Sequence, residues 1–276
     1  MKKFLSLILA GMMALSVASC GAPAGEGDQK AASGSASTES DWQYISDKGE
    51  MIVGITLFAP MNYKEGNELV GFETEFAKAV CEKIGVTPKF QEIDWGSKEI
   101  ELNAKNIDCI WNGMTITDEL KQNMSISVPY MHNKQVMITK KENVEKYAQS
   151  TDGANVVAES GSAGDELATT DEFFKGANYT AVDSQAKALM DVESGSSDVA
   201  IVDYVLSIGS IGEGTDYSDL AVIESKEFGN EEYGVAFRKD SDVTEKVNAA
   251  MQELAADGTL NTIAEKYKLE KMLLLK

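Results

Sequence analysis

The chain has 276 residues, with 45 acidic against 25 basic side chains, a net charge of −20 and 43% hydrophobic residues. This hydrophobic content is enough for a packed core, so the composition excludes a disordered chain. The acidic excess, with no basic cluster interleaved with aromatics, argues against a nucleic-acid partner.

The first twenty residues have the features of an export signal. A positive end is followed by an apolar stretch over 4–17 and by Val-Ala-Ser-Cys, which ends at Cys20. The stretch is too short to span a membrane as a helix, so it indicates a signal peptide over 1–19. The ending resembles the bacterial lipobox, whose cysteine is acylated after cleavage; an ordinary signal peptide with an incidental cysteine is the alternative. We expect an extracytoplasmic protein, anchored to the membrane by a lipid on Cys20, with a flexible linker over 20–40.

Strand and helix patterns alternate from residue 51 onward. The sequence predicts strands over 51–57, 89–93, 107–111, 155–159, 179–182 and 198–202. It predicts helices over 72–84, 98–105 and 184–193, near Thr117 and Asp165, and from Val243 to about Gly258. Such alternation is typical of βαβ units and predicts an α/β protein with largely parallel sheets in two lobes.

Cysteine and histidine offer little chemistry. Cys81 and Cys109 both fall in apolar segments, and we favour two buried thiols, although an exported pair could bridge. His132 is the single imidazole, which removes multi-histidine metal sites, and we interpret it as a surface residue at a connection between lobes. We expect no metal and no cofactor.

Four segments carry a resemblance to a known family. Residues 71–75 (GFETE) are similar to the G-F-D-x-D signature of extracellular solute-binding proteins of polar amino-acid ABC importers. Residues 107–117 (IDCIWNGMTIT) resemble its I-D-x-x-x-x-G-M-T-I-T segment. Residues 198–203 (DVAIVD) and 233–239 (YGVAFRK) resemble its D-A-V-x-x-D and Y-G-I-A-x-R-K strands. The match runs in unbroken order from about residue 51 to 268.

The resemblance implies a two-lobed periplasmic-binding-protein-like clamp of type II, each lobe a mainly parallel sheet flanked by helices. The first lobe would comprise 41–133 and the returning segment 229–276, and the second lobe 134–228. Two hinge crossings would lie near 131–136 and 228–233. Such a clamp captures a polar amino acid or a close derivative by closing, and it delivers the ligand to an importer permease without acting as an enzyme.

The resemblance also implies roles for site residues. Asp203, at the end of a strand, would accept from an α-ammonium, with helix capping as the alternative. Phe58 and Trp95 would be aromatic walls; core packing is the alternative for Phe58, whereas Trp95, beside Asp94 and Gly96, is expected to be less deeply buried. Two further groups would bind the polar end of the ligand through backbone and hydroxyl groups: Asn112, Gly113 and Thr115, and the helix N-terminus at Ser160, Ser162 and Ala163.

One departure concerns the ligand's carboxylate. Leu120 stands where the family usually has an arginine that forks onto the α-carboxylate, and Arg238 is the only arginine in the chain. Three outcomes remain open. The carboxylate rests on the amides near Ser162 and on Thr115, or Lys121 replaces the arginine, or the ligand is an amine without a free α-carboxylate.

Two rivals use the same scaffold. A dehydratase-like enzyme would need a positioned acid or base and cationic anchors in the cleft, which the sequence does not offer. A receptor sensor domain would be followed by a spanning helix, which we do not expect here.

Overall fold

The computed structural model describes residues 40–226 and 228–276. The predicted signal peptide, Cys20 and nearly all of the predicted linker lie outside these residues. In the described part of the chain, no helix combines the length and the apolar character that crossing a bilayer requires.

The first lobe is built on a sheet in which three strands run parallel. These are β4 (Thr87–Glu92), β1 (Glu50–Ile55) and β5 (Cys109–Thr115). Its helices are α1 (Asp41–Lys48), α2 (Phe72–Ile84), η1 (Trp95–Ser97), α3 (Lys98–Asn103), α4 (Asp118–Asn123), α9 (Val243–Ala256) and α10 (Thr259–Lys266). A short hairpin of β2 (Tyr63–Glu65) and β3 (Glu68–Val70) stands apart from the sheet.

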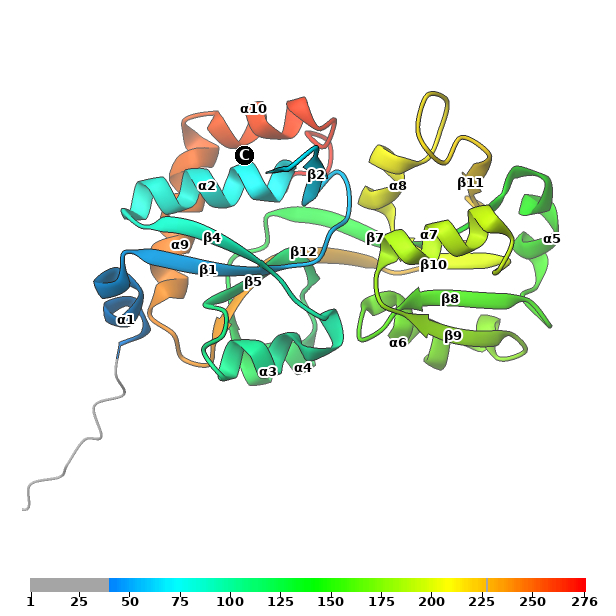
Figure 1. Ribbon diagram of the computed structural model, residues 1–276, viewed down its shortest axis with the longest axis horizontal. Helices are drawn as coiled ribbons and strands as arrows, with labels where there is room; N and C mark the ends of the chain where they lie inside the picture. The colour runs from blue at the N-terminus through cyan, green and yellow to red at the C-terminus, as the bar shows by residue number, and fades with distance from the viewer. Residues whose placement is uncertain (1–39, 227) are drawn as a thin grey trace, which may run out of the picture. The chain divides into compact units, whose positions relative to one another are not determined.

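The second lobe repeats this plan. Its parallel strands are β9 (Asn178–Val182), β8 (Asn155–Glu159) and β10 (Val199–Asp203). The other elements are η2 (Lys141–Asn143), α5 (Val144–Gln149), α6 (Ala163–Thr170), η3 (Glu172–Phe174), α7 (Gln185–Ser194), α8 (Tyr204–Ser210) and β11 (Leu220–Val222). The two α/β lobes predicted from the alternation are confirmed (Figure 1).

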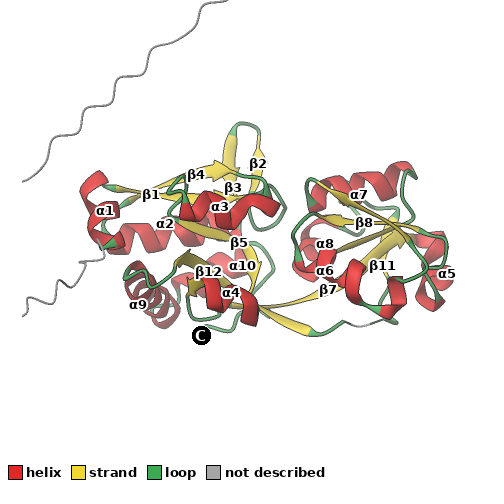
Figure 2. Ribbon diagram, turned by 90° about the horizontal axis from the view of Figure 1, so that it is seen from below, coloured by secondary structure: helices red, strands yellow, loops and turns green. Residues whose placement is uncertain are grey.

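Two long strands connect the lobes. β7 (Met131–Lys140) and β12 (Asn230–Arg238) pair with each other in antiparallel fashion and run from one lobe to the other (Figures 1 and 2). β7 continues against β10 and β11, while β12 continues against β5 and β6 (Met124–Ile126), all antiparallel. The sheets are therefore mixed rather than mainly parallel. The reason is that β7 and β12, which join the lobes, run antiparallel to β10 and β5, the parallel-sheet strands beside them. The lobe boundaries and the hinge stay predictions.

The start and end of the described chain both belong to the first lobe. Phe72 and Phe76 of α2 face the core, where Phe76 packs against the rings of Trp111 and Tyr130. Helices α9 and α10 pack against α2, so the C-terminal segment covers the same layer as the N-terminal one (Figure 1). The first lobe is therefore built from two segments of the chain, because β12 brings the C-terminal segment back to pair with β5.

Most predicted elements are found within a few residues of their predicted bounds, and three differences matter. Helix α1 was not predicted, because it is short and buries only Ile45. The strand predicted over 107–111 begins later and runs through Thr115, so the predicted site segment lies on β5 itself. Cys81 and Cys109 are free and buried, which agrees with the favoured interpretation.

Candidate functional site

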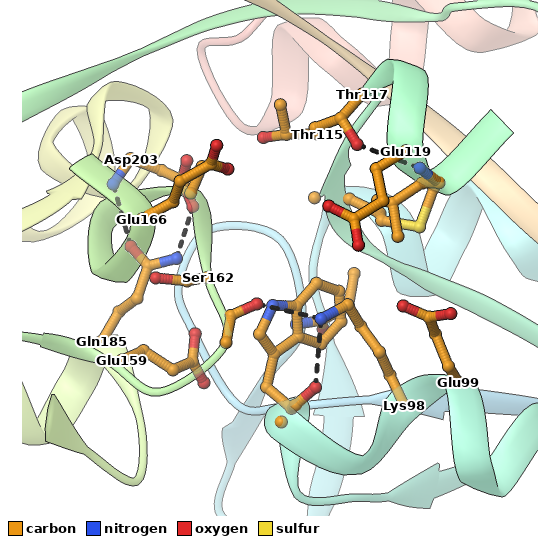
Figure 3. A pocket seen from close by; sticks show the side chains of 18 residues that line it. Lys98, Glu99, Thr115, Thr117, Glu119, Glu159, Ser162, Glu166, Gln185 and Asp203 are labelled. Atoms are coloured by element: carbon orange, nitrogen blue, oxygen red, sulfur yellow. Dashed lines mark hydrogen bonds between the residues drawn. The ribbon is translucent and has the colours of Figure 1, made fainter. Parts of the chain in front are cut away.

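A pocket of about 300 Å³ lies between the lobes, and we call it the interlobe pocket. The first-lobe wall comes from η1 and α3, from β5, and from the start of α4. Its residues are 95–96, 98–99, 112–115, 117 and 119–120. Its second-lobe wall is formed by Glu159, 161–163, Glu166, Gln185 and Asp203. This volume suits one small molecule, and polar side chains from both lobes point into it (Figure 3).

Asp203 lies at the carboxyl end of β10, as predicted, and is 5% exposed. It occupies the N-cap position of α8, but its side chain makes no capping hydrogen bond, which removes the alternative interpretation. Instead, its Oδ1 accepts from Asn133 Nδ2 at 2.5 Å and Gln135 Nε2 at 2.7 Å, and its Oδ2 accepts from Gln185 Nε2. Three amides thus fix the orientation of this carboxylate.

A second carboxylate shares two of these amides. Asn133 and Gln135 also donate to Glu231 Oε2, at 2.9 and 3.0 Å, and the Thr115 hydroxyl donates to the same oxygen at 3.0 Å. A chain of hydrogen bonds therefore runs from β5 through both connecting strands to Asp203. Asn133 and Gln135 are two residues apart on β7, so both side chains lie on one face of the strand. This two-residue spacing of amide side chains was the sequence signal that could have pointed to them as site residues.

Lys98 is the only cationic side chain in the wall of the interlobe pocket. It is 8% exposed, and its Nζ donates to Gly161 O at 2.9 Å and Trp95 O at 3.3 Å. The Nζ also lies 4.8 Å from the Trp95 ring centroid. Lys98 thereby joins the first lobe to the loop before α6. Burial lowers its pKa, because the charged form loses water.

Close backbone contact accompanies this link. Gly161 has φ 70°, and a Cβ at this position would lie 2.9 Å from Gly96 Cα. A side chain is therefore excluded on steric grounds as well as by the backbone conformation. Glycine here lets the two lobes touch beside the pocket.

The predicted aromatic walls behave differently from each other. Trp95 lines the interlobe pocket but is only 6% exposed, packed with Leu102 and Ile110, so the expectation of shallow burial was wrong. The reason is that Lys98 and α3 fold over it. Phe58 is 3% exposed and lines a separate cavity, although a Cβ on Gly113 would lie 2.8 Å from its ring. Phe58 therefore supports the β5 backbone rather than the wall of this pocket.

The predicted polar residues line the pocket except for Ser160, which lies outside its wall, and protein partners hold much of their hydrogen-bonding capacity. Asn112 donates through Nδ2 to Thr56 Oγ1 at 2.7 Å, and Gly113 N donates to Glu73 Oε1 at 2.8 Å. In the loop before α6, Ser160 N donates to Val182 O at 2.9 Å, and Ser162 N donates to Glu159 O at 3.1 Å. The expectation that the Ser160 and Ser162 amides are free for an anion is thus not met, because the Ser160 amide bonds to β9 and the Ser162 amide bonds within the turn. Ala163 and the Ser162 side chain remain in the pocket wall.

Glu73 had no predicted role beyond the motif. It is fully enclosed beneath the pocket, where it accepts from Gly113 N, Asn62 Nδ2 and the Tyr130 hydroxyl. The motif at 71–75 therefore anchors β5 under the site.

The carboxylate anchor named in the resemblance is absent from the pocket. Leu120 lines the wall, whereas Lys121 is exposed and pairs with Asp118 at 3.5 Å. Arg238 is buried elsewhere, on Asp41 and Asp108. Neither of these two cations replaces the missing guanidinium.

Burial perturbs the carboxyl groups of the site in one direction. It raises the pKa of Glu159 to about 8, with the Asp203 carboxylate adding to the shift. It also raises the pKa values of Glu73 and Glu231 to about 7 each, and that of Asp203 above its usual range. These carboxyl groups are desolvated, and hydrogen bonds only partly offset the effect.

These shifts predict a pH dependence of stability without added ligand. Between the ordinary value of 4.5 and about 8, the folded protein holds protons that the unfolded chain has lost. The free energy of unfolding is therefore expected to be greatest near pH 4.5, the ordinary pKa of glutamate, and to fall as the pH rises through the folded pKa values. Thermal unfolding from pH 5 to 8.5 measures this, and Glu159→Gln should flatten the fall. A midpoint that rises over this range contradicts the prediction.

A model of the family described as bacterial extracellular solute-binding proteins, family 3, matches residues 51–270. The chain belongs to this family. A relative, "Arginine-binding extracellular protein ArtP" from Bacillus subtilis (strain 168), is 28% identical over 273 residues, which cover 97% of this chain and 98% of ArtP. The predicted resemblance is confirmed.

Two solved structures of the same two-lobed type are similar to this family-3 chain. An ABC uptake transporter substrate-binding protein from Streptococcus pneumoniae, with bound histidine, is 29% identical with a TM-score of 0.75, covering 86% of this chain and 99% of that one. The ancestral amino-acid-binding protein AncCDT-1, described as a precursor of cyclohexadienyl dehydratase, is 26% identical with a TM-score of 0.74, covering 83% and 99%. Relatives of this chain are therefore amino-acid-binding extracellular proteins of ABC transporters, and the predicted two-lobed α/β fold is confirmed, with mixed sheets.

Proposed function

We propose that this chain captures a small, positively charged amino acid or a close derivative in the interlobe pocket and hands it to the permease of an ABC importer. The observation that carries this function is the fixed Asp203 carboxylate, buried in a cavity of about 300 Å³ that both lobes line. A carboxylate held by amides is a suitable acceptor for an ammonium group. The arginine and histidine relatives support a nitrogen-rich ligand.

Capture in this proposal is coupled to movement of the lobes. β7 and β12 are the strands that join the lobes, and the pocket walls come from both sides of them. A ligand that contacts both walls favours the closed arrangement by its differential affinity. The permease recognises that arrangement, and a lipid on Cys20 holds the protein at the membrane.

The proposal is for binding without turnover. His132 is exposed on β7 and lies outside the interlobe pocket. The AncCDT-1 neighbour is named as an amino-acid-binding protein and a dehydratase precursor, so fold alone does not separate the two classes. Absence of chemical conversion is therefore tested directly.

Mass spectrometry of the small molecule released from the purified protein tests the proposed function. We expect a nitrogen-containing cation that rebinds, in calorimetry, to protein freed of it by dialysis, and that is recovered unchanged after long incubation. A released dicarboxylate, sugar or phosphate ester contradicts the assignment. A new product that accumulates during incubation contradicts binding without turnover.

A further inference from the structure

Glu159 brings an unpartnered oxygen to the interlobe pocket. The residue ends β8 and is 2% exposed, yet its Oε1 has no hydrogen-bond donor among the described residues. A buried carboxylate oxygen without a partner is costly. Because Glu159 lines the pocket, a ligand can supply the missing donor.

Carboxylates dominate both walls of this pocket. Glu159, Glu166 and Asp203 belong to the second lobe, and Glu99 and Glu119 belong to the first (Figure 3). Against these five carboxyl groups stands the single ammonium of Lys98, itself bonded to two carbonyl oxygens. A cation placed between the walls is attracted from both sides, whereas an added carboxylate meets repulsion from both.

Several donors that a carboxylate ligand could use are already bonded within the protein. Thr115 donates to Glu231, and Gly113 N donates to Glu73. Gly161 N donates to Asp165 Oδ2 at 2.7 Å, and the neighbouring serine amides donate to backbone oxygens. Leu120 adds only an apolar surface. A free α-carboxylate therefore loses its hydration on entering the pocket. In exchange it finds chiefly the Ser162 and Thr117 hydroxyls and the third N–H of Lys98.

A bare metal ion does not explain the carboxylates. Within residues 40–226 and 228–276, no three His, Cys, Asp or Glu side chains are gathered so that they could hold a metal ion. Asp203 and Glu159 are instead arranged around Gln185, which donates to Asp203 Oδ2. The geometry suits an extended organic cation with several N–H donors.

We propose that the interlobe pocket selects a carboxylate-free amine or guanidine, and that Glu159 binds its N–H groups beside Asp203. The inference rests on the proposed function, since it concerns the same pocket, but it names a different chemical class from a free amino acid. Glu159 supplies specificity, because N–H groups and positive charge placed against its buried oxygen favour the ionised form of this carboxyl group, whose pKa burial raises to about 8 without ligand.

Three matched pairs test the ligand class by calorimetry with the full chain. Each pair is an amino acid and the amine left when its carboxyl group is removed: arginine and agmatine, lysine and cadaverine, histidine and histamine. We expect the amine to bind at least about tenfold more tightly in every pair that shows binding. An amino acid that binds as tightly as its amine overturns the inference and leaves amino-acid capture intact. Heat from none of the six compounds overturns both the inference and the proposed function.

Two substitutions test the residues. Glu159→Gln is expected to weaken binding of the preferred amine roughly tenfold or more, since it removes one charge-assisted contact. Glu193→Gln is the matched control, because Glu193 lies in the same lobe and has a buried unpartnered oxygen but does not line the pocket. Equal affinities for the two variants, with unchanged thermal midpoints, overturn the role of Glu159. Leu120→Arg should shift the preference in each pair toward the amino acid; an unchanged preference overturns the assignment of Leu120 to the carboxylate-excluding wall.

Discussion

Asp203→Asn is expected to weaken ligand binding at least about 30-fold, because removing one partner of a buried, hydrogen-bonded charge pair costs about 2 to 5 kcal/mol. The carboxylate is 5% exposed, so water cannot replace the lost attraction. Asparagine keeps the shape and one acceptor oxygen for Gln135 and Asn133, so folding should persist. The reduced affinity is therefore expected to reflect a lost contact with the ligand and not a misfolded protein.

Calorimetry with the ligand released from the native protein measures this effect. Asp183→Asn is the control, since Asp183 is an exposed aspartate of the same lobe, outside the pocket wall. We expect the control to bind as the unaltered protein does. Retained affinity in Asp203→Asn, with a normal unfolding transition, contradicts the placement of the cation at this carboxylate.

Arg238→Met is expected to lower the free energy of unfolding by about 3 kcal/mol, the lower end of the range for breaking a buried ion pair. The guanidinium contacts Asp41 at 2.9 Å and Asp108 at 3.3 Å, and it donates to the carbonyl oxygens of Leu102 and Ile107. Asp108 is fully buried but keeps Lys48 as a second partner, which moderates the loss. Methionine fills the volume but satisfies none of these acceptors.

Urea denaturation followed by circular dichroism measures the change. Lys239→Met removes the neighbouring charge at an exposed position, and it should alter stability by less than about 0.5 kcal/mol. Arg238 is not part of the pocket wall, so ligand affinity under native conditions should stay the same. Equal midpoints for the two variants contradict a structural role for the buried guanidinium.

The sequence predicted the parts of the fold that depend on local patterns. The strand over 155–159 and the helix that begins at Val243 have strong periodicity and clear ends, and their bounds are met. The antiparallel return of β12 has no local signal, because it depends on partners more than 90 residues away, such as Asn133 opposite Glu231. Local sequence patterns therefore predict the strands and helices of each lobe better than the pairing of the strands that connect the lobes.

The same limit applies to the site. Asp203 was accessible to prediction, since a motif marks it at the end of a strand. Lys98 was not, because its role arises from Gly161 on the other lobe. Glu159 was predicted only as the end of a strand; its importance depends on an unsatisfied oxygen, which appears only once the surrounding donors are placed.

The bond from Lys98 to Gly161 joins the lobes through protein atoms alone. Part of the free energy that stabilises the closed arrangement of the lobes therefore comes from the protein itself and not from the ligand. A ligand that enters only when this bond is broken has an apparent affinity reduced in proportion to the fraction of molecules in which it is broken. The same bond, once it re-forms beside a bound ligand, also has to break before the ligand leaves, so it opposes release as well as entry.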